Sequence, residues 1–335
     1  MLSWTTGSRV AMITANSYTS DKADLWNRFV AGSKNGLFLF DRSYMDYHSD
    51  RFQDASVMMC RDGDLVAIMP ANRVGNSIHS HGGLTFGGLI TGAEMSTPRF
   101  LEVFSAMIDH LKREGVSELV YKTVPTLYHQ LPAEEDRYAL FLAGAERFRC
   151  DVTSAIIPGK RLPLRKGRKS EVKKAQRLGL RFEESDRWED FWQVLTDNLR
   201  RKHELNPVHT LEEIRLLHSR FPSNIRLFAV FAGAEMQAGT VIYESALVAH
   251  TQYIGCTETG RETGALDFLI VGLLETPYAG KPFFDFGVSN ENGGRFLNRG
   301  LIDFKEGFGA RSITHDFYRL NPQVVDPEAL KADKL

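Results

Sequence analysis

The sequence predicts an α/β protein made of two tandem domains that share one layout. The chain has 335 residues, which is enough for two domains with substantial cores. Hydrophobic residues make up 43% of it and charged residues 25%, the balance of a globular protein. The order of expected elements in the first half (hairpin, strand, helix, strand, helix, strand) also recurs in the second half, which is the strongest of the three observations.

In the first half, apolar periodicity and turn signals define the elements. They are a helix at 22–32, strands at 55–60, 65–71 and 78–81, a helix at 97–114, a strand at 119–122, a helix at 132–147 and a strand at 152–157. Asp62-Gly63 is a hairpin turn signal between the first two strands. Thr97 and Pro98 are expected to cap and open the long helix, and Gly115 ends it.

The second half repeats this order after two helices. Its elements are helices at 188–203 and 211–220, strands at 225–231, 237–244 and 247–254, a helix at 265–274, a strand at 282–286, a helix that carries Phe304-Lys305 and a strand at 312–320. Thr210 and Glu213 predict a capping box for the second helix. Gly233 provides the turn of a second hairpin.

Composition places the boundary between the halves in residues 158–180. Residues 158–163 read as a Pro- and Gly-containing linker, and residues 164–178 are rich in Lys and Arg. We therefore expect domains at 1–157 and 181–320, a basic linker or helix at 158–180, and a polar, peripheral tail at 321–335.

The net charge, the cysteine count and the lack of long apolar runs disfavour several classes of protein. The net charge of −1 gives no global field for DNA or an anionic membrane. The three cysteines are too few and too widely spaced for a disulfide framework or a metal site, and no metal is expected. Without a signal-peptide pattern or an apolar run of ~18 residues, the expected location is the cytoplasm.

Two segments of the first half are candidate linings of a substrate cleft. Residues 78–89 combine histidines with glycines, so His81 and backbone N–H groups could meet a substrate, together with Tyr121 and Lys122 of a nearby strand. The alternative is a bulged strand with structural glycines. Residues 38–52 are dense in polar and aromatic side chains, which makes His48 and Arg51 candidates, although a half-buried surface helix fits the same pattern.

The basic segment is a candidate phosphate-binding element. Arg168 and Lys173 are its representative cations, and such groups could grip a nucleotide-linked substrate, coenzyme A or tRNA. Lys and Arg every three or four residues also describe an ordinary solvated helix. Both interpretations stay open at the level of the sequence.

A carboxylate among aromatic residues marks the second half. Asp285 ends an expected strand between Phe284 and Phe286, which suggests a general base with a raised pKa. A structural role, in which Asp285 braces its neighbours through hydrogen bonds, is the alternative. His250, Thr251 and Gln252 on an adjacent strand could face the same cleft.

The sequence Phe304-Lys-Glu-Gly-Phe-Gly309 resembles the C-terminal signature of the Fem family, aminoacyl transferases built from two acetyltransferase-like (GNAT) domains. Residues 42–48, 80–88, 132–136, 250–253 and 285–287 add to a resemblance that covers about residues 20–320, and the chain is similar in particular to Fem-like proteins of bacterial surface-polysaccharide loci. It departs from the family at His48, where a lysine is usual.

The resemblance implies two GNAT-like domains with a cleft between them, and Lys305 at the reaction centre as the group that stabilises the oxyanion. Arg261, Gly264 and Ala265 resemble the start of the GNAT loop whose backbone N–H groups bind the pyrophosphate of acetyl-CoA. Leu266 departs from that pattern. A loop in which Gly264 merely caps a helix is the alternative.

The expected function is therefore that of an enzyme, an N-acyltransferase that moves an acyl group, acetyl first, from acyl-CoA to an amino group of a sugar or sugar nucleotide. The alternatives are aminoacyl transfer from tRNA and a degenerate GNAT-fold binding protein. Asp285, His250 and Lys305 are the expected catalytic residues. The expected substrate contacts are His48, Arg51, His81, Tyr121, Lys122, Arg168 and Lys173. The oligomeric state is left open.

Overall fold

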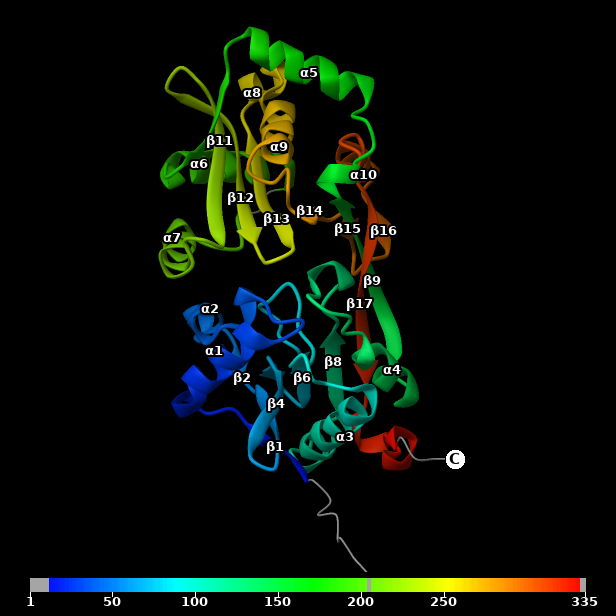
Figure 1. Cartoon of the computed structure of the whole chain (residues 1–335). Helices are drawn as coiled ribbons and strands as arrows, with labels where there is room; N and C mark the ends of the chain where they lie inside the picture. Colours follow the sequence, from blue (N-terminus) through cyan, green and yellow to red (C-terminus); the bar gives the residue numbers. More distant parts are fainter. Residues whose placement is uncertain (1–11, 204–205, 332–335) are drawn as a thin grey trace, which may run out of the picture. The chain divides into compact units, whose positions relative to one another are not determined.

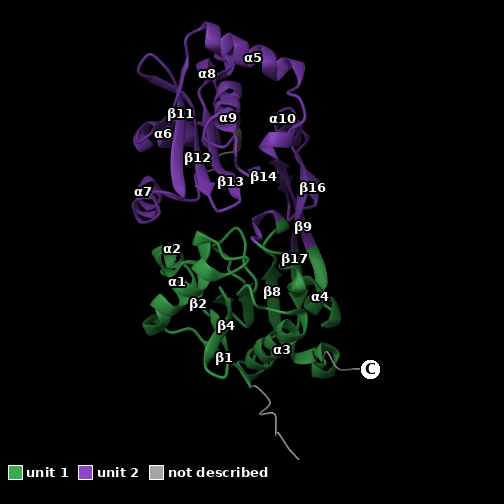
Figure 2. Cartoon of the chain, in the orientation of Figure 1, with its two compact units in different colours: residues 1–126, 131–148, 317–335 green, residues 127–130, 149–316 purple. Residues whose placement is uncertain are grey.

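The computed structural model describes residues 12–203 and 206–331, and Figure 1 shows the order of their elements. The expected absence of a signal peptide and the last four residues of the predicted tail lie outside these ranges. The chain divides into two compact units (Figure 2). Unit 1 comprises residues 1–126, 131–148 and 317–335, and unit 2 comprises residues 127–130 and 149–316.

Unit 1 contains two sheets and a long helix. Its helices are α1 (Ala23–Gly32), α2 (Arg42–Met45), α3 (Thr97–Arg113) and α4 (Glu135–Leu142). Its strands are β1 (Ile13–Ser17), β2 (Gln53–Asp54), β3 (Val57–Arg61), β4 (Asp64–Met69), β5 (Asn72–Val74), β6 (Ser77–His79), β7 (Ile90–Thr91) and β8 (Glu118–Lys122). One sheet has the order β1-β3-β4-β7, and β8, β6, β5 and β2 are neighbours in the other. β6 and β8 are parallel, because α3 connects them as a crossover helix.

The core of unit 1 lies beneath α3. Phe100, Phe104, Met107 and Leu111 recur at helical spacing on α3 and are buried in one apolar cluster. The predicted cap is one residue off: Ser96 precedes α3 without a side-chain hydrogen bond, and Pro98 lies in the first turn.

Unit 2 is built on one sheet with helices around it. Its helices are α5 (Lys166–Arg177), α6 (Trp188–His203), α7 (Leu211–Arg220), α8 (Glu258–Thr263), α9 (Ala265–Glu275) and α10 (Arg299–Glu306). Its strands are β10 (Arg181–Ser185), β11 (Ile225–Ala232), β12 (Glu235–Glu244), β13 (Val248–Cys256) and β14 (Phe283–Val288), with the small pair β15 (Asn290–Glu291) and β16 (Phe296–Leu297). The order of the large sheet is β10-β11-β12-β13-β14, followed by β9 (Glu146–Ile156).

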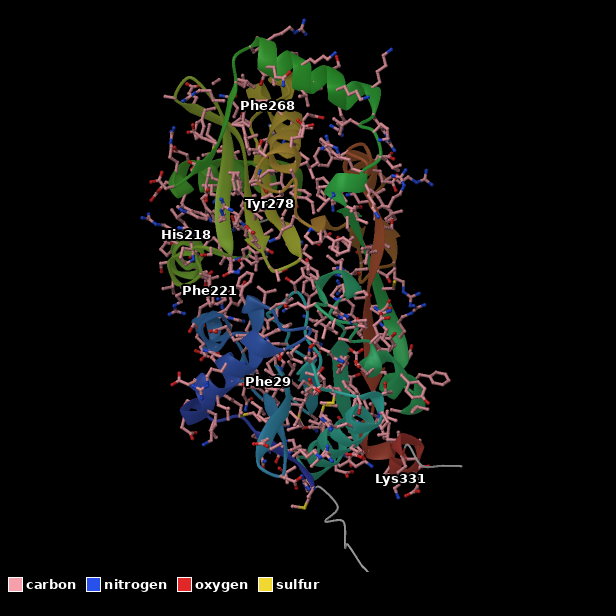
Figure 3. All side chains as sticks on the ribbon, viewed as in Figure 1. Phe29, His218, Phe221, Phe268, Tyr278 and Lys331 are labelled. Carbon is pink, nitrogen blue, oxygen red and sulfur yellow. The ribbon has the colours of Figure 1, made fainter. Side chains whose placement is uncertain are left out.

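The apolar helix α9 packs on this sheet. Leu269, Ile270 and Leu273 are fully buried with Phe228 and Phe284 of the strands. Phe268 and Tyr278 mark this part of unit 2 in Figure 3. The capping box of Thr210 and Glu213 at α7 is confirmed, since both of its hydrogen bonds are present.

The parallel strands β13 and β14 separate part of the way along. They pair only at Val248–His250 with Phe283–Asp285, after which no register pair joins them. In the pairing of β12 with β13, Val241 matches Tyr253 and Ile242 matches Thr251, so Gln252 is an extra, bulged residue. The middle of the sheet is therefore open between the ends of β13 and β14.

The last strand of each half belongs to both units. Residues 153–156 of β9 pair with β14 in unit 2, and residues 317–320 of β17 (Arg311–Leu320) pair with β8 in unit 1. The observed boundaries thus differ from those expected: residues 158–180 belong to unit 2, and the chain's end belongs to unit 1. The tail is not peripheral, because Val325 and Leu330 are buried in the core of unit 1.

Candidate functional site

A cavity of about 590 Å³ occupies the opening between β13 and β14. This volume falls in the range of sites that hold a drug-sized molecule. The wall combines apolar side chains of the strands and helices with a few polar groups. The residues that line it are Asn198, Thr251, Gln252, Ile254, Gly255, Cys256, Arg261, Leu266, Phe286, Val288, Asn298, Gly300, Leu301, Phe304 and Lys305.

Thr251 lies where the two strands part, one residue after the last pair, His250 with Asp285. Only 5% of Thr251 is exposed, and its hydroxyl has no hydrogen-bond partner among the residues that the structure describes. A buried hydroxyl without a partner costs free energy. Its position in the wall of the cavity makes it a group that a ligand could satisfy.

Lys305 reaches the cavity wall from α10. Its Nζ donates to the carbonyl oxygens of Gly287 at 2.7 Å and Val288 at 2.8 Å, and to Oγ of Ser289 at 2.9 Å. Burial lowers the pKa of Lys305 to about 8, although the charge of Asp285 opposes this shift. The predicted oxyanion contact is not preformed, because all three N–H groups of the ammonium already have acceptors.

Asp285 is fully buried on β14 and accepts several hydrogen bonds. Oδ2 accepts from Nδ1 of His250 at 2.8 Å and from the Tyr128 hydroxyl at 3.1 Å. Oδ1 accepts from the Thr153 hydroxyl and from the backbone N–H of Gly287 at 3.1 Å. Successive strand residues point to opposite faces, so Asp285 and His250 lie on the face opposite Phe286 and the cavity.

These contacts correct the role predicted for Asp285. Burial alone would raise the pKa of its carboxyl, but the hydrogen bond and charge of His250 and the hydrogen bond of Thr153 outweigh burial and hold the pKa well below its usual range. A carboxylate with a low pKa and satisfied oxygens is a poor proton acceptor. The predicted base is therefore better placed at His250, whose Nδ1 is held by Asp285 and whose Nε2 has no hydrogen-bond partner among the described residues.

Three residues of this cluster were not predicted. Tyr128 is buried, and burial raises the pKa of its hydroxyl well above the usual value, with the charge of Asp285 adding to the shift. Burial lowers the pKa of His315 on β17 to about 4, against the charge of Asp285. Thr153, the third, lies on β9. Neither a motif nor a spacing identified them, because Tyr128, Thr153 and His315 are distant from Asp285 in the sequence and only folding brings them near it.

The segment predicted to bind pyrophosphate is covered within unit 2. Gly264 has a positive φ of 78° at the start of α9, and a Cβ at this position would lie 2.4 Å from the backbone oxygen of Glu171 on α5. Ala265 is fully buried. Arg261, by contrast, is exposed, lines the cavity and donates to the side chain of Asn198 at 2.5 Å.

The two predicted contacts of the basic segment differ in exposure. Nη1 of Arg168 lies 3.0 Å and 3.2 Å from the two oxygens of Asp267, so this guanidinium is engaged inside unit 2. Lys173 is exposed and lines a shallow groove with Ser170, Gln176 and Arg177. Among the described residues, Lys173 has no ion pair.

The predicted contacts of unit 1 lie close together. The rings of His48 and His81 are 5.4 Å apart, and Nζ of Lys122 donates to the carbonyl oxygens of His81 and Leu84 at 2.8 and 2.6 Å. Burial is the main reason why the pKa of His81 falls to about 3, with the charge of His48 contributing. These two imidazoles are buried, which limits their access to a substrate in this state. That residues of both halves line one cleft stays a prediction.

The other two candidates of unit 1 are a buried tyrosine and an exposed arginine. The Tyr121 hydroxyl accepts from the backbone of Leu89 at 2.7 Å and donates to Asp136 at 3.2 Å. Arg51 is exposed and its guanidinium lies 5.4 Å from the ring of Tyr47. Tyr121 is therefore a core residue, and Arg51 is open to solvent.

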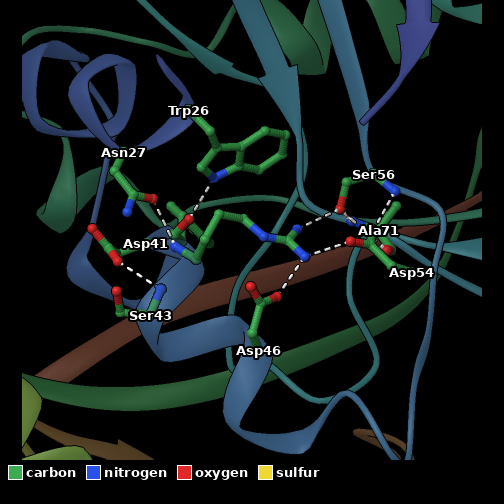
Figure 4. A network of polar contacts seen from close by, with 10 residues as sticks. Trp26, Asn27, Asp41, Ser43, Asp46, Asp54, Ser56 and Ala71 are labelled. Carbon is green, nitrogen blue, oxygen red and sulfur yellow. Dashed lines mark hydrogen bonds and ion pairs between the residues drawn. The ribbon is translucent and has the colours of Figure 1, made fainter. Parts of the chain in front are cut away.

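The start of the 42–48 segment is structural. The buried guanidinium of Arg42 forms 2.5 Å ion pairs with Asp46 and Asp54 (Figure 4). It also lies 4.0 Å from the ring centre of Tyr18. Its Nη1 also donates to the Ser56 hydroxyl at 3.4 Å. These contacts fold the segment that carries His48 and leave Arg42 itself engaged.

Within residues 12–203 and 206–331, no three His, Cys, Asp or Glu side chains form a group that could hold a metal ion. Over the same ranges, no helix has both the length and the apolar character needed to cross a membrane.

The sequence matches no family model and no curated protein. Its structure is similar to that of FemX, with 12% identity and a TM-score of 0.62 over 90% of this chain and 96% of that one. L-PGS from Bacillus licheniformis has 13% identity and a TM-score of 0.58 over 94% and 96% of the two chains. A tandem GNAT protein from the clavulanic acid biosynthesis pathway has 10% identity and a TM-score of 0.50 over 94% and 100%.

At these identities the similarity shows the fold. The predicted fold class, an α/β protein of two tandem GNAT-like domains, is confirmed. The parting of β13 and β14 around a cavity is the feature of this fold that positions the candidate site.

Proposed function

We propose that this protein is an acyltransferase that transfers an acyl group to an amine, with the reaction at the opening between β13 and β14. The observation that carries the proposal is the pairing of two features across this opening. The cavity lies on one face of the strands, and the Asp285-held imidazole of His250 lies on the other. The acyl donor would enter the cavity, and the amine would approach from the face of His250.

In this reaction the amine nitrogen attacks the acyl carbonyl carbon. A C–N bond forms and the carbonyl oxygen gains negative charge. The carbonyl then re-forms as the bond from the carbon to the carrier's sulfur or oxygen breaks, and the carrier leaves with that electron pair and takes up a proton. Nε2 of His250 receives the proton that the amine loses, while Asp285 stabilises the imidazolium through Nδ1–H. Holding both reactants at the opening supplies the proximity on which direct transfer depends.

Two groups of the wall could favour the charge on the oxygen. The buried ammonium of Lys305 gives the cavity a positive charge, and exchanging one of its three acceptors for the substrate oxygen would make the contact direct. The extra residue at Gln252 leaves its backbone out of the register with β12, so its N–H is a second candidate donor.

For the donor, the sequence favours acyl-CoA, acetyl first, with an amino group of a sugar or sugar nucleotide as acceptor. The exposed Arg261 at the cavity supports a phosphate-bearing donor. The cover that Glu171 provides over Gly264 opposes pyrophosphate binding at the start of α9.

An aminoacyl-tRNA donor is the second candidate, and a specific observation favours it. Lys166, Lys169, Lys173 and Arg177 of α5 are exposed and have no ion pair among the described residues. Such a cationic helix surface suits the phosphates of RNA. A cytoplasmic location agrees with either donor and stays a prediction.

A panel of donors tests the proposal. The chain would be melted alone and with acetyl-CoA, CoA, aminoacylated tRNA or uncharged tRNA, and active pairs would be sought with amino-sugar acceptors. A ligand at 100 times its Kd should stabilise the fold by ~2.7 kcal/mol. A shift and N-acylated product with one donor class identify that class. Shifts without product with any acceptor would favour a binding protein, and no shift with any donor would contradict the proposal.

A further inference from the structure

Arg168 joins three helices of unit 2 at a position just outside the cavity. From α5, its guanidinium binds both carboxylate oxygens of Asp267 in the first turn of α9. Its Cζ also lies 4.6 Å from the ring centre of Phe304 in the last turn of α10 and 5.0 Å from that of Phe308, which follows the helix. One side chain thus holds α9 through charge and α10 through its flat face.

The beginning of α5 is tied to the same end of α10. The backbone N–H of Arg165 donates to the carbonyl oxygen of Gly307 at 3.0 Å. A Cβ at Gly307 would lie 3.1 Å from Nε of Arg168, so the glycine lets the guanidinium lie close against the helix end. The placement of Arg168 is therefore set by the backbone as well as by its ion pair.

The helix that Arg168 holds forms one wall of the cavity. Phe304 and Lys305 of α10 line the cavity, as does Leu266, the neighbour of Asp267. Arg168 does not line it. We infer that Arg168 is a positioning residue: it fixes the Phe304 ring and the α10 wall, and through them it sets how tightly the cavity binds its ligand. This inference rests on the proposed function for its kinetic part only.

Lysine cannot replace arginine in this role. Nη1 of Arg168 contacts both oxygens of Asp267 while the flat guanidinium lies against the rings of Phe304 and Phe308, whereas an ammonium is a point charge without a flat face. Arg168→Lys therefore keeps the charge beside Asp267 and removes the planar contact with Phe304. It is the variant that isolates the positioning effect.

Arg226, which also pairs with Glu244, provides a control of the same kind in the same unit. It binds both oxygens of Glu184, lies 4.9 Å from the ring centre of Phe228, and its side chain is 26% exposed, the same as that of Arg168. It is not part of the cavity wall. Arg226→Lys should weaken the fold by a similar mechanism without reaching the cavity.

The test has one arm that needs no substrate. The chain would be labelled with 4-fluorophenylalanine, and the Phe304 resonance would be assigned with Phe304→Leu. We expect one narrow fluorine line for Phe304 in wild type and Arg226→Lys, and a shifted, broadened or split line in Arg168→Lys. An unchanged Phe304 line in a folded Arg168→Lys would overturn the inference.

The second arm uses the donor found active in the panel. Loss of a stacked, charged contact should raise the KM for that donor about tenfold in Arg168→Lys, with kcat changed less, while Arg226→Lys keeps both constants. An unchanged KM, or an equal change in both variants, would overturn the positioning role. If wild type transfers no acyl group, the proposed function fails, and the fluorine arm still decides whether Arg168 holds Phe304.

Discussion

Lys305 places an ammonium group in the cavity wall, where two carbonyl oxygens and one hydroxyl hold it. Its charge therefore supports both the turn after β14 and the electrostatics of the cavity. The resemblance to Fem proteins points to Lys305, but only the folded structure shows that its three N–H donors are in use. A variant at this position should consequently affect folding as well as rate.

We expect Lys305→Met to lower the rate of acyl transfer by ~10²–10³, because it removes the positive charge from the cavity. It should also lower the free energy of unfolding by about 1–3 kcal/mol, because the carbonyl oxygens of Gly287 and Val288 lose their donor. Steady-state kinetics and urea unfolding measure the two effects, with Lys305→Arg as the variant that keeps the charge. Full activity in Lys305→Met would remove the ammonium from the mechanism.

The ionisation of Lys305 adds a pH dependence. Its pKa in the folded chain, about 8, is below the ordinary value of 10.5, so the unfolded state binds more protons between these two values. Stability should therefore rise with pH across this window, while activity that needs the ammonium falls above pH ~8. In Lys305→Arg the alkaline fall of kcat should move to higher pH, and a fall that stays near pH 8 would assign it to another group.

Asp285→Asn tests the proton acceptor. An amide nitrogen next to Nδ1 of His250 would favour the tautomer that carries its proton on Nε2, which could then no longer accept one. The rate should fall by ~10²–10⁴ with a smaller change in KM. His250→Gln should lower the rate to a comparable level, and an active His250→Gln enzyme would exclude the imidazole as the base.

Thr251→Val should leave the free energy of unfolding unchanged or raise it, because the buried hydroxyl of Thr251 has no partner among the described residues. Thr240→Val is the matched control. The fully buried Thr240 donates to the carbonyl oxygen of Tyr253 at 2.7 Å, so its replacement should cost about 0.5–1.5 kcal/mol. Chemical denaturation compares the two, and a clear loss in Thr251→Val would show that its hydroxyl is bonded within the fold.

At the scale of elements, the two central strands of unit 2 decide what the site can do. β13 carries an extra residue at Gln252, and β14 loses its register with β13 after Asp285. Neither event has a pattern in the sequence, since residues 247–254 and 282–286 read as ordinary buried strands. The opening lies where the pairing of β13 with β14 ends, next to the bulge of β13 at Gln252.

Local signals predicted α3, α7 and the two hairpins, whereas the helix expected at 132–147 is only Glu135–Leu142 and residues 146–147 already belong to β9. The capping box at α7 and the apolar stripe of α3 are satisfied within a few residues of the chain. The contacts of Asp285 with Thr153 and of Arg168 with Phe304 join segments more than 100 residues apart, so periodicity carries no information about them. The candidate residues were found by type and motif, but their roles depended on packing.

Helix α4 illustrates an element whose first turn contains a buried carboxyl. Burial raises the pKa of Asp136 to about 7, although hydrogen bonds from Tyr121 and from the backbone N–H of Arg137 oppose the shift. Its folded pKa lies above the ordinary value of 3.8, so the folded state binds more protons in between. The stability that Asp136 contributes to the fold is therefore complete below pH ~4 and is lost as the pH rises through about 7.

Asp136→Asn should accordingly flatten the dependence of stability on pH between about 4 and 7, because an amide does not ionise. Urea unfolding at several pH values measures this slope, with the exposed Glu146→Gln as control. A variant whose slope equals that of wild type would show that Asp136 is ionised over the whole range.

At the scale of the whole molecule, the two halves of the sequence are less separable than the tandem layout suggests. Unit 1 takes residues 317–335 from beyond unit 2, and unit 2 takes residues 127–130 from within the first half. The predicted cut between 157 and 181 therefore does not yield two complete units. The order of the elements is consistent with a boundary in residues 158–180. The pairing of β17 with β8 is not, because it places residues 317–320 in unit 1.

Truncation at two positions should separate the contributions of the chain's end. A chain of residues 1–320 loses Val325 and Leu330 from the core of unit 1, whereas residues 1–316 also lose the pairing of β17 with β8. Each step should lower the stability of unit 1, the first by several kcal/mol given the usual cost of removing buried Leu side chains. Hydrogen exchange should report the loss in α3, with α9 as the internal reference. Equal protection of α3 in all three chains would show that unit 1 folds without its last strand.

The shared strands also affect how the protein folds during its synthesis on the ribosome. Domains are generally completed in the order in which they are made, the N-terminal one first. Here every residue of unit 2 has been synthesised by position 316, while β8 of unit 1 still waits for residues 317–320. Until they emerge, one edge of β8 has unpaired backbone groups, which is the kind of edge that recruits foreign strands. The nascent chain is thus exposed to aggregation at β8 until residues 317–320 have emerged and paired with it, and a chaperone that covers this edge in the meantime would protect it.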